Sequence, residues 1–424
     1  MKKNIMQGTL YLTTSQTAFV ASGYLINVGL GRLLGPDDYG LYTVVISLMT
    51  MVNLILTTGI PQAVSKYVAH GTGSSTMIRD TALKMQLVLS IAIFLIYFLL
   101  AEKIALLLND STLTPFIRAS AFIVPGYAIY SMLIGYLNGL LEYGKQAIIT
   151  IYYSLIKVVF ILALVIAGYS VMGAIVGFVF APIAALLFGA YFMWNGGITL
   201  ATSNDSSIKS SISVKKILDF SIPIMFFSVV TNLIIGIDLF FVKAYLTNYE
   251  TGIYSAASMI SKVPFFLIGG LFGALFPAIS NASANNNIER TRKYILNSIR
   301  HSLVAIVPAV IIISAFSETL ITLVYSSKYA SGAGVLSVLI FGIGFYSLFF
   351  LFMTILNGSG RPYISLFISA IVLALNILLN IMLVPVYHLI GAAAATGLAS
   401  IAGFVMAGIY INWKFGIFSS NASS

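Results

Sequence analysis

The chain has 424 residues, of which 59% are hydrophobic and only 8% are charged, and its mean hydropathy is +1.00. Soluble domains carry about 25% charged residues, so this composition excludes a soluble globular protein. The formal net charge of +10 comes mainly from loops between apolar stretches, so it indicates membrane topology and not nucleic-acid binding. The absence of cysteine excludes disulfides and thiolate metal sites.

Apolar stretches of membrane-spanning length follow one another along the whole chain. A helix needs about 20 apolar residues to cross the hydrocarbon region. The alternating segments of a transmembrane barrel do not occur in the sequence, so helices must satisfy the backbone. We therefore predict an all-α polytopic membrane protein with about 12 transmembrane helices, at about 9–31, 41–65, 83–101, 117–140, 147–168, 172–194, 217–243, 253–279, 299–325, 333–356, 363–385 and 390–412.

The first span and the longest connector define the predicted domain organisation. Lys2 and Lys3 precede a polar stretch, and no small-residue cleavage site follows a short apolar core, so we expect an uncleaved first span. The connector at 195–216 is rich in Ser, Asn and Lys and follows six spans. We predict an N-lobe at 1–194, a cytoplasmic inter-lobe linker at 195–216 and a C-lobe at 217–424.

Basic residues are distributed unequally between the two sets of connectors. The outer connectors hold only Arg32, Lys103, Arg118, Lys243 and Lys328. Because basic connectors stay in the cytoplasm, this asymmetry predicts a multi-pass protein of the cell (inner or plasma) membrane with both termini cytoplasmic. The predicted cytoplasmic connectors hold Lys2, Lys3, Lys66, Arg79, Lys84, Lys145, Lys209, Lys215, Lys216, Arg290, Arg292, Lys293, Arg300, Arg361 and Lys414.

The second half of the chain repeats landmarks of the first half in the same order. Six spans is an even number, so the two copies share one orientation in the membrane. We therefore predict two six-helix lobes related by a parallel repeat, an arrangement that alternating-access transporters use. The matching landmarks are Gly40 and Tyr42 with Gly252 and Tyr254, Leu137-Asn138-Gly139 with Leu356-Asn357-Gly358, and Gly173-Ala174 with Gly391-Ala392.

Equivalent spans of the two halves carry polar residues on one helical face. Two interpretations stay open: close helix packing through small and polar residues, or a stripe that lines a water-filled cavity between the lobes. The residues are Thr9, Thr13, Gln16, Gly23 and Asn27 in span one, and Ser221, Ser228, Thr231 and Asp238 in span seven.

Ionisable residues within spans are candidates for a functional site. A charge at the bilayer centre costs about 2.5–3.5 kcal/mol on insertion scales, so such a residue usually faces a cavity or a partner. Asp238 and Lys262 form either a structural ion pair or part of a binding site. In the second interpretation Lys262 and Arg32 present positive charge to an anionic ligand, while Asp238 orients or titrates. The competing role of Arg32 is interfacial anchoring, and Lys157 can extend its amine to the interface.

Motifs for nucleotides, metals and cofactors are absent or incomplete. The stretch from Gly139 to Gln146 lacks the final Ser or Thr of a phosphate loop, and no buried strand precedes it. His70, His301 and His388 are scattered without the spacing of a metal site. We therefore expect no cofactor and no metal.

The stretch Gly31-Arg32-Leu33-Leu34-Gly35-Pro36-Asp37-Asp38-Tyr39-Gly40-Leu41-Tyr42 resembles the opening signature of polysaccharide transporters, the O-antigen (Wzx-type) flippases. Asp238 followed by Gly252-Ile253-Tyr254-Ser255-Ala256-Ala257 looks like their mid-chain signature. These proteins belong to the multidrug/oligosaccharidyl-lipid/polysaccharide exporter superfamily. The resemblance implies a flippase that translocates a polyprenyl-pyrophosphate-linked oligosaccharide from the cytoplasmic to the outer leaflet by alternating access. Arg32 and Asp238 are the only candidate site residues that the matching motifs themselves contain.

The predicted substrate-binding residues are Arg32, Lys262, Asn27 and Gln16, the last three inferred from position, and Asp238 is the candidate for coupling or for a charge pair. The expected partners are the lipid-linked oligosaccharide, membrane lipids and, as candidates, other glycan-assembly membrane proteins, with no nucleic acid. The chain looks too short for the fourteen spans of lipid II flippases, and their set of cavity arginines has no match here.

Two alternatives remain to the predicted flippase. One is a cation-coupled small-molecule exporter of the same superfamily. Drug exporters of that superfamily often place a carboxylate in span one. In this chain the nearby acidic residues, Asp37 and Asp38, lie in the turn that follows span one, which argues against a proton-driven drug exporter. The other is an integral-membrane glycan polymerase or ligase, which would need acid/base residues and a sizeable outer loop. The outer connectors are short, so the prediction is a transporter and not an enzyme.

Overall fold

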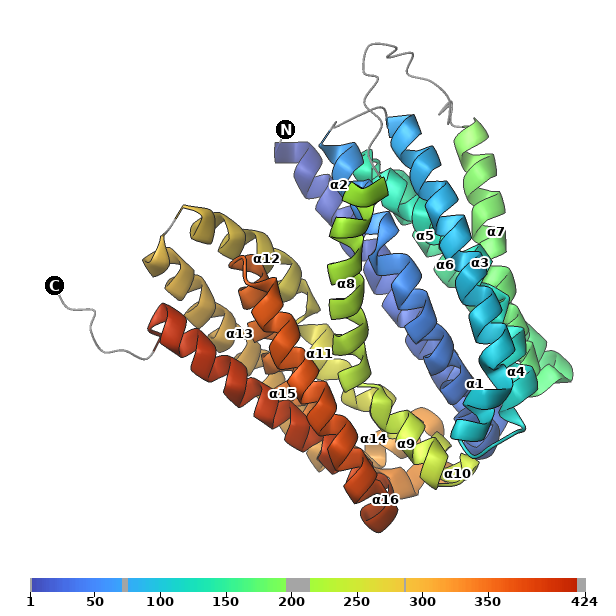
Figure 1. Ribbon diagram of the computed structural model, residues 1–424. Coiled ribbons are helices and arrows are strands. Elements are labelled where there is room, and N and C mark those ends of the chain that lie inside the picture. Colours follow the sequence, from blue (N-terminus) through green and yellow to red (C-terminus); the bar gives the residue numbers. More distant parts are fainter. Residues whose placement is uncertain (1, 71–74, 196–213, 286, 418–424) are drawn as a thin grey trace. The chain divides into compact units, whose positions relative to one another are not determined.

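The computed structural model describes residues 2–70, 75–195, 214–285 and 287–417. Within these ranges the chain is almost entirely helical and contains no strand. The chain divides into two compact units, Met1–Val229 and Val230–Ser424 (Figure 1). Most of the predicted linker at 195–216 lies outside the described residues, so the division into lobes at that linker stays a prediction.

The helices of the first unit run in the order that the hydropathy pattern predicts. A π-helical turn, Val165–Tyr169, connects its last two helices. The helices are α1 (Lys2–Thr58), α2 (Ile60–Ala69), α3 (Ser75–Leu107), α4 (Leu113–Ala121), α5 (Ile123–Gly139), α6 (Tyr143–Leu164) and α7 (Ser170–Asn195).

The second unit begins within α8 (Val214–Ile234), whose earlier turns belong to the first unit. A 3-10 segment, Ser327–Gly332, precedes its most buried long helix, α15. The other helices are α9 (Ile237–Tyr245), α10 (Asn248–Ser261), α11 (Val263–Leu267), α12 (Gly269–Ala284), α13 (Ile288–Ala315), α14 (Ser317–Tyr325), α15 (Ala333–Gly358) and α16 (Pro362–Phe415).

The described helices account for about twelve membrane crossings. Among the described residues, eight helical segments are long and apolar enough to cross a membrane, and a bent pair makes up to nine. Three of the eight, Gln7–Ala69, Tyr143–Phe192 and Pro362–Phe415, have 50 to 63 residues. Each contains a residue with non-helical backbone, at Gly35, Gly168 or His388. Since one crossing takes about 20 residues, each of these three segments suits two crossings.

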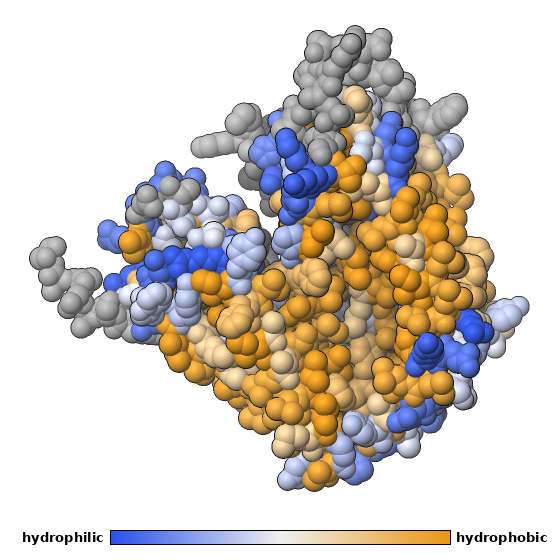
Figure 2. Space-filling view, in the orientation of Figure 1, coloured by the Kyte–Doolittle hydropathy of each residue, from blue (hydrophilic) through white to orange (hydrophobic). Residues whose placement is uncertain are grey.

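The apolar surface of the first unit lies along the length of its helices. On α3, the side chains of Val88, Leu99 and Leu107 are exposed by 70%, 71% and 78%, whereas Gln86 and Ser90 on the same helix are buried. Figure 2 shows the visible side of this unit as a broad hydrophobic surface with hydrophilic side chains toward the helix ends. A surface of this kind matches a hydrocarbon solvent, because apolar side chains need no burial there.

The repeat predicted from sequence landmarks recurs in the packing inside each unit. A Cβ atom placed on Gly139, at the end of α5, would lie 3.0 Å from the carbonyl oxygen of Ser65 in α2. A Cβ atom on Gly358, at the end of α15, would lie 3.1 Å from the carbonyl oxygen of Phe276 in α12. In both copies the Asn-Gly pair therefore ends a helix where the backbone of another helix comes close, which explains the glycine.

The hairpins before Gly173 and Gly391 also share one backbone conformation. Ser170 has φ 46° and ψ −136°, and His388 has φ 52° and ψ −130°. These values lie near those of the first central residue of a type II′ turn, a position that favours glycine. The predicted connectors between 168 and 172 and between 385 and 390 contain these two residues. The parallel repeat thus extends to a strained backbone position at equivalent sites.

Candidate functional site

Asp238 is the centre of a buried polar cluster in the second unit. The helical chain breaks between Ile234, where α8 ends, and Ile237, where α9 begins, so Asp238 lies in the first turn of α9. Its side chain is 2% exposed. The carboxylate accepts hydrogen bonds from the Tyr254 hydroxyl at 2.5 Å, from the Thr396 hydroxyl at 3.0 Å and from the Leu239 backbone N–H at 2.8 Å. These three donors satisfy the oxygens of a carboxylate that is buried in a membrane-spanning segment.

Asn376 of α16 bonds to the backbone where α8 ends, and Asn380 of the same helix bonds to Asn376. The carbonyl of Ile234 has no following helical turn to bond to, and it accepts a hydrogen bond from Asn376 Nδ2 at 2.7 Å. Asn380 Nδ2 donates to the Asn376 carbonyl at 2.9 Å. Both asparagines are fully buried, and the Asn380 Oδ1 atom has no hydrogen-bond partner among the described residues. The break therefore places the Ile234 carbonyl and the Asn376 amide together, four residues before Asp238 in the sequence.

The atoms that could ligate an ion decide which ions this cluster suits. They are oxygens of one carboxylate, hydroxyl groups, side-chain amides and a helix-terminal carbonyl, so the set favours a proton or a hard cation over a transition metal. No group of three or more His, Cys, Asp or Glu side chains that could hold a metal occurs among the described residues. The cluster is thus a candidate ion site in which Asp238 supplies the charge.

The first unit contains a related contact in α1. Asn27 Nδ2 donates to the Gly23 carbonyl at 2.8 Å, and its Oδ1 accepts a hydrogen bond from the Tyr39 hydroxyl at 3.0 Å. Tyr39 follows the break at Gly35, where φ is 77°. In each unit, a side-chain oxygen on the span before a hairpin therefore accepts a hydrogen bond from a tyrosine hydroxyl on the span after it. The acceptor is the amide of Asn27 in the first unit and the carboxylate of Asp238 in the second.

The other predicted site residues occupy different environments. Gln16 and Arg32 are exposed on α1. Lys262 is half-buried at the C-terminal cap of α10 and lies within electrostatic range of Asp238. Gln16, Asn27 and Arg32 belong to the first unit, and Asp238 and Lys262 to the second. The common cavity that the sequence predicts for them stays a prediction.

Lys157 does not extend to the membrane interface. Its side chain is 3% exposed. Its amine lies 4.7 Å from the ring centre of Phe19 in α1, 5.4 Å from that of Tyr153 in α6 and 5.5 Å from that of Phe178 in α7. The three ring faces stabilise the cation within the first unit, so the structure gives Lys157 a packing environment inside the helices.

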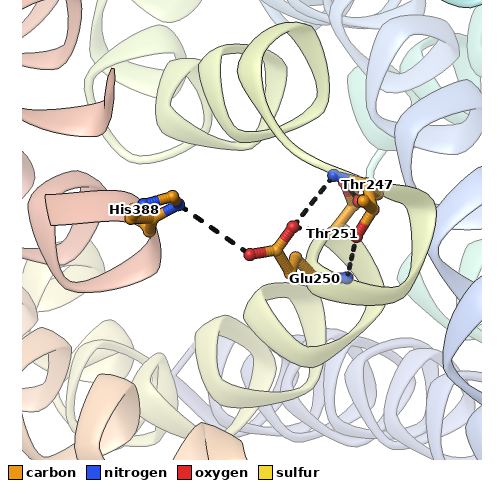
Figure 3. Close-up of polar contacts among 4 residues, drawn as sticks. All are labelled: Thr247, Glu250, Thr251 and His388. Carbon is orange, nitrogen blue, oxygen red and sulfur yellow. Dashed lines mark hydrogen bonds and ion pairs between the residues drawn. The ribbon is translucent and has the colours of Figure 1, made fainter. Parts of the chain in front are cut away.

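A hairpin contact lies beside the Asp238 cluster in sequence but at the end of the helices. Thr247 and Glu250 form a capping box at the start of α10, and Glu250 Oε1 lies 4.0 Å from Nδ1 of His388 (Figure 3). The first unit has an equivalent contact, in which the Ser170 hydroxyl donates to Asp38 at 2.6 Å. In both units this contact connects two hairpins whose backbones change direction.

Sequence reasoning identified Asp238 but missed Thr396, Asn376 and Asn380. Thr396 lies 158 positions from Asp238, and a one-dimensional pattern contains no information on such a contact. Asn376 and Asn380 are four residues apart in an otherwise apolar span, so they share a helical face. This amide pair is a sequence signal for a polar face on the predicted span at 363–385, comparable to the polar faces predicted for spans one and seven.

Comparisons with known proteins agree with the fold. The family described as "Polysaccharide biosynthesis protein" matches residues 30–333. An uncharacterised membrane protein of Methanocaldococcus jannaschii is 25% identical, covering 95% of this chain and 97% of that protein. The lipid II flippase MurJ of Bacillus subtilis is 24% identical over 96% of this chain and 83% of its own. The inward-facing structure of a multidrug resistance MATE family transporter of the MOP superfamily aligns with a TM-score of 0.81 at 15% identity, covering 97% of this chain and 100% of that one.

The family match covers more than half of the chain, and the helical, apolar, two-unit architecture agrees with it. A structural likeness at 15% identity adds the fold alone. The chain is a multi-pass membrane transporter that belongs to the polysaccharide biosynthesis protein family.

Proposed function

We propose that this protein is a flippase that moves a polyprenyl-pyrophosphate-linked oligosaccharide from the cytoplasmic to the outer leaflet for cell-surface polysaccharide biosynthesis. The observation that carries the proposal is the similarity to the Bacillus subtilis lipid II flippase along 96% of this chain, within the family that the match to residues 30–333 defines. In this proposal the protein lies in the cell membrane with both termini in the cytoplasm.

The predicted substrate-binding residues match the chemistry of such a ligand. A sugar hydroxyl that enters hydrocarbon without a hydrogen bond costs several kcal/mol. The amide of Gln16 would offer hydrogen bonds to sugar hydroxyls, while Arg32 and Lys262 would attract the pyrophosphate. The lipid tail needs no polar partner and would remain in the bilayer.

The Asp238 cluster supports a two-state mechanism of alternating access. Its carboxylate belongs to α9 and accepts bonds from α10 and α16, through Tyr254 and Thr396. Neutralising it with a proton or a cation would therefore change the interactions of three helices together. Secondary transporters often place coupling ions at broken helices, and Asp238 directly follows such a break, between α8 and α9.

The test is surface glycan display in a strain that lacks the gene and is complemented with variants. Arg32→Ala and Lys262→Ala are expected to abolish display while the protein level in the membrane stays that of the wild type. Lys103→Ala removes another exposed cation of the first unit and is the matched control, with normal display expected. Normal display in both test variants would contradict the proposed ligand contacts, and normal display in the uncomplemented deletion strain would contradict the function.

A second candidate, a cation-coupled exporter of small molecules, has one specific observation in its favour. The MATE family transporter structure aligns over 97% of this chain with a TM-score of 0.81. Drug-sensitivity profiling of the same deletion strain separates the two functions. An exporter predicts increased drug sensitivity with normal glycan display, whereas the flippase predicts lost glycan display with unchanged sensitivity.

A further inference from the structure

A cavity of about 340 Å³ lies in the first unit between α3, α5 and α7, away from the residues discussed above. Arg79 and Asp80 line it from the second turn of α3. Most of the remaining lining is apolar and includes Leu83, Met132, Leu133 and Leu186. The volume is within the range of about 300–1,000 Å³ that is usual for small-ligand sites.

The polar and apolar parts of the lining are at different depths. Leu83 follows Arg79 by one helical turn, which corresponds to about 6 Å further along α3. Leu133 lies six residues before Gly139, where α5 ends. The charged residues are therefore near the end of the helices that the charge asymmetry predicts to be cytoplasmic. The apolar residues lie further from that end, within the predicted spans at 83–101 and 117–140.

The charged part of the cavity contains a cation and an anion side by side. The guanidinium of Arg79 donates to Asp80 Oδ1 from Nε at 2.8 Å, and its Nη2 atom also lies 2.8 Å from that oxygen. It also lies 5.8 Å from the ring centre of Tyr136, which lines the same cavity. The side chain of Arg79 is 22% exposed and that of Asp80 is 56% exposed. The pair is thus partly exposed and carries no net charge.

We propose that this cavity binds one zwitterionic phospholipid of the surrounding membrane, a lipid whose headgroup carries both a phosphate and an ammonium. A guanidinium has five N–H donors, so it can bind a phosphate together with a carboxylate. The phosphate binds Arg79, the ammonium binds Asp80, and one hydrocarbon chain lies along Leu83 and Leu133. A purely anionic headgroup would meet the charge of Asp80 without an ammonium to compensate it.

This choice of ligand follows from charge complementarity. Basic pockets between helices on the cytoplasmic side select anionic headgroups, and such a pocket would need an excess of Lys and Arg. Here each charge of the pair matches the opposite charge of a zwitterionic headgroup. The site is independent of the Asp238 cluster and of the proposed function, since none of the predicted substrate-binding residues lines it.

The experiment is native mass spectrometry of the purified full chain after delipidation, titrated with phosphatidylethanolamine or with phosphatidylglycerol. We expect one tightly bound phosphatidylethanolamine, with an affinity about tenfold higher than that for phosphatidylglycerol, as for one charge-assisted contact. Leu133→Trp fills the cavity and is expected to lower the phosphatidylethanolamine affinity about tenfold. Val88→Trp adds the same ring to the exposed side of α3 and is expected to leave it unchanged.

Asp80→Asn tests the headgroup contact separately, at a position exposed enough to tolerate substitution. This variant is expected to lose the preference for phosphatidylethanolamine over phosphatidylglycerol. If Leu133→Trp does not fold, Asp80→Asn alone tests the proposal. Each of three results would overturn the proposal. These are equal affinities of the wild type for the two lipids, equal effects of the two tryptophan variants, and an unchanged lipid preference in Asp80→Asn. Displacement by free phosphoethanolamine as effective as by the whole lipid would also overturn it, because the chain would then contribute nothing.

Discussion

Replacing Tyr254 with phenylalanine removes one hydroxyl and leaves the ring in place. That hydroxyl donates to the buried Asp238 carboxylate at 2.5 Å, and the Tyr254 side chain is fully buried. A hydrogen bond to a charged group contributes about 1.5–3 kcal/mol to stability. In a folding unit of about 200 residues, each kcal/mol lowers the unfolding temperature by about 2–4 °C, so we expect a decrease of about 3–12 °C.

The assay is thermal unfolding of the purified protein in one detergent, with Tyr249→Phe as the matched control. Tyr249 is also in α10, but its hydroxyl donates to the neutral carbonyl of Lys328 at 3.1 Å in an exposed position. We expect this variant to change the stability by no more than about 0.5 kcal/mol. Equal shifts for the two phenylalanine variants would refute the inference that the buried Asp238 side chain depends on its hydrogen-bond donors.

A double-mutant cycle with Asp238→Asn assigns the effect to the pair. If the Tyr254 hydroxyl acts through the carboxylate, Tyr254→Phe should destabilise the Asp238→Asn background less than the wild type, with a coupling energy of about 0.5–3 kcal/mol. Additive effects would mean that the hydroxyl stabilises the fold through another group.

Three further predictions concern the first unit, each measured by thermal unfolding. Gly35→Ala should cost about 1–3 kcal/mol, because φ is 77° and ψ is 173° at this break in α1; a neutral result would mean that the break relaxes. Gly135→Ala should also destabilise by about 1–3 kcal/mol, since its Cβ would lie 2.5 Å from the Pro61 carbonyl oxygen, whereas Gly126→Ala meets nothing closer than 3.5 Å and should be tolerated. Lys157→Met should be neutral or stabilise by about 1 kcal/mol, because it removes a buried charge that is compensated by ring faces among the described residues; a loss above about 2 kcal/mol would contradict this.

The sequence predicts the helical class and the repeat well because both depend on local patterns. Apolar length determines where helices cross, and the Gly35-Pro36 pair marks the hairpin at which α1 breaks. The break between α8 and α9 within the predicted span at 217–243 was not predicted, although Gly236 lies there. One glycine in an apolar span is compatible with a continuous helix, so tertiary contacts such as that from Asn376 decide the outcome.

The candidate site is predicted only as far as single residues suggest it. A carboxylate in an apolar span is conspicuous in any sequence, and Asp238 is found in this way. Its partners on α10 and α16 become visible only after the helices pack. Lys262 is an intermediate case: its charge in a span was recognised, but its position at the end of α10, before Pro264, depends on a helix bend that periodicity does not reveal.

The matched dihedral angles of Ser170 and His388 show that the two halves share a backbone corner without sharing its side chain. A hydroxyl and an imidazole have little chemistry in common, yet the main chain follows the same path at both positions, one that glycine would adopt with less strain. The shape of this corner is therefore the same in both halves although its side chains differ. If the halves descend from one duplicated ancestor, the corner was already present in it, and exchanging the two short segments between halves should yield a chimera that still folds.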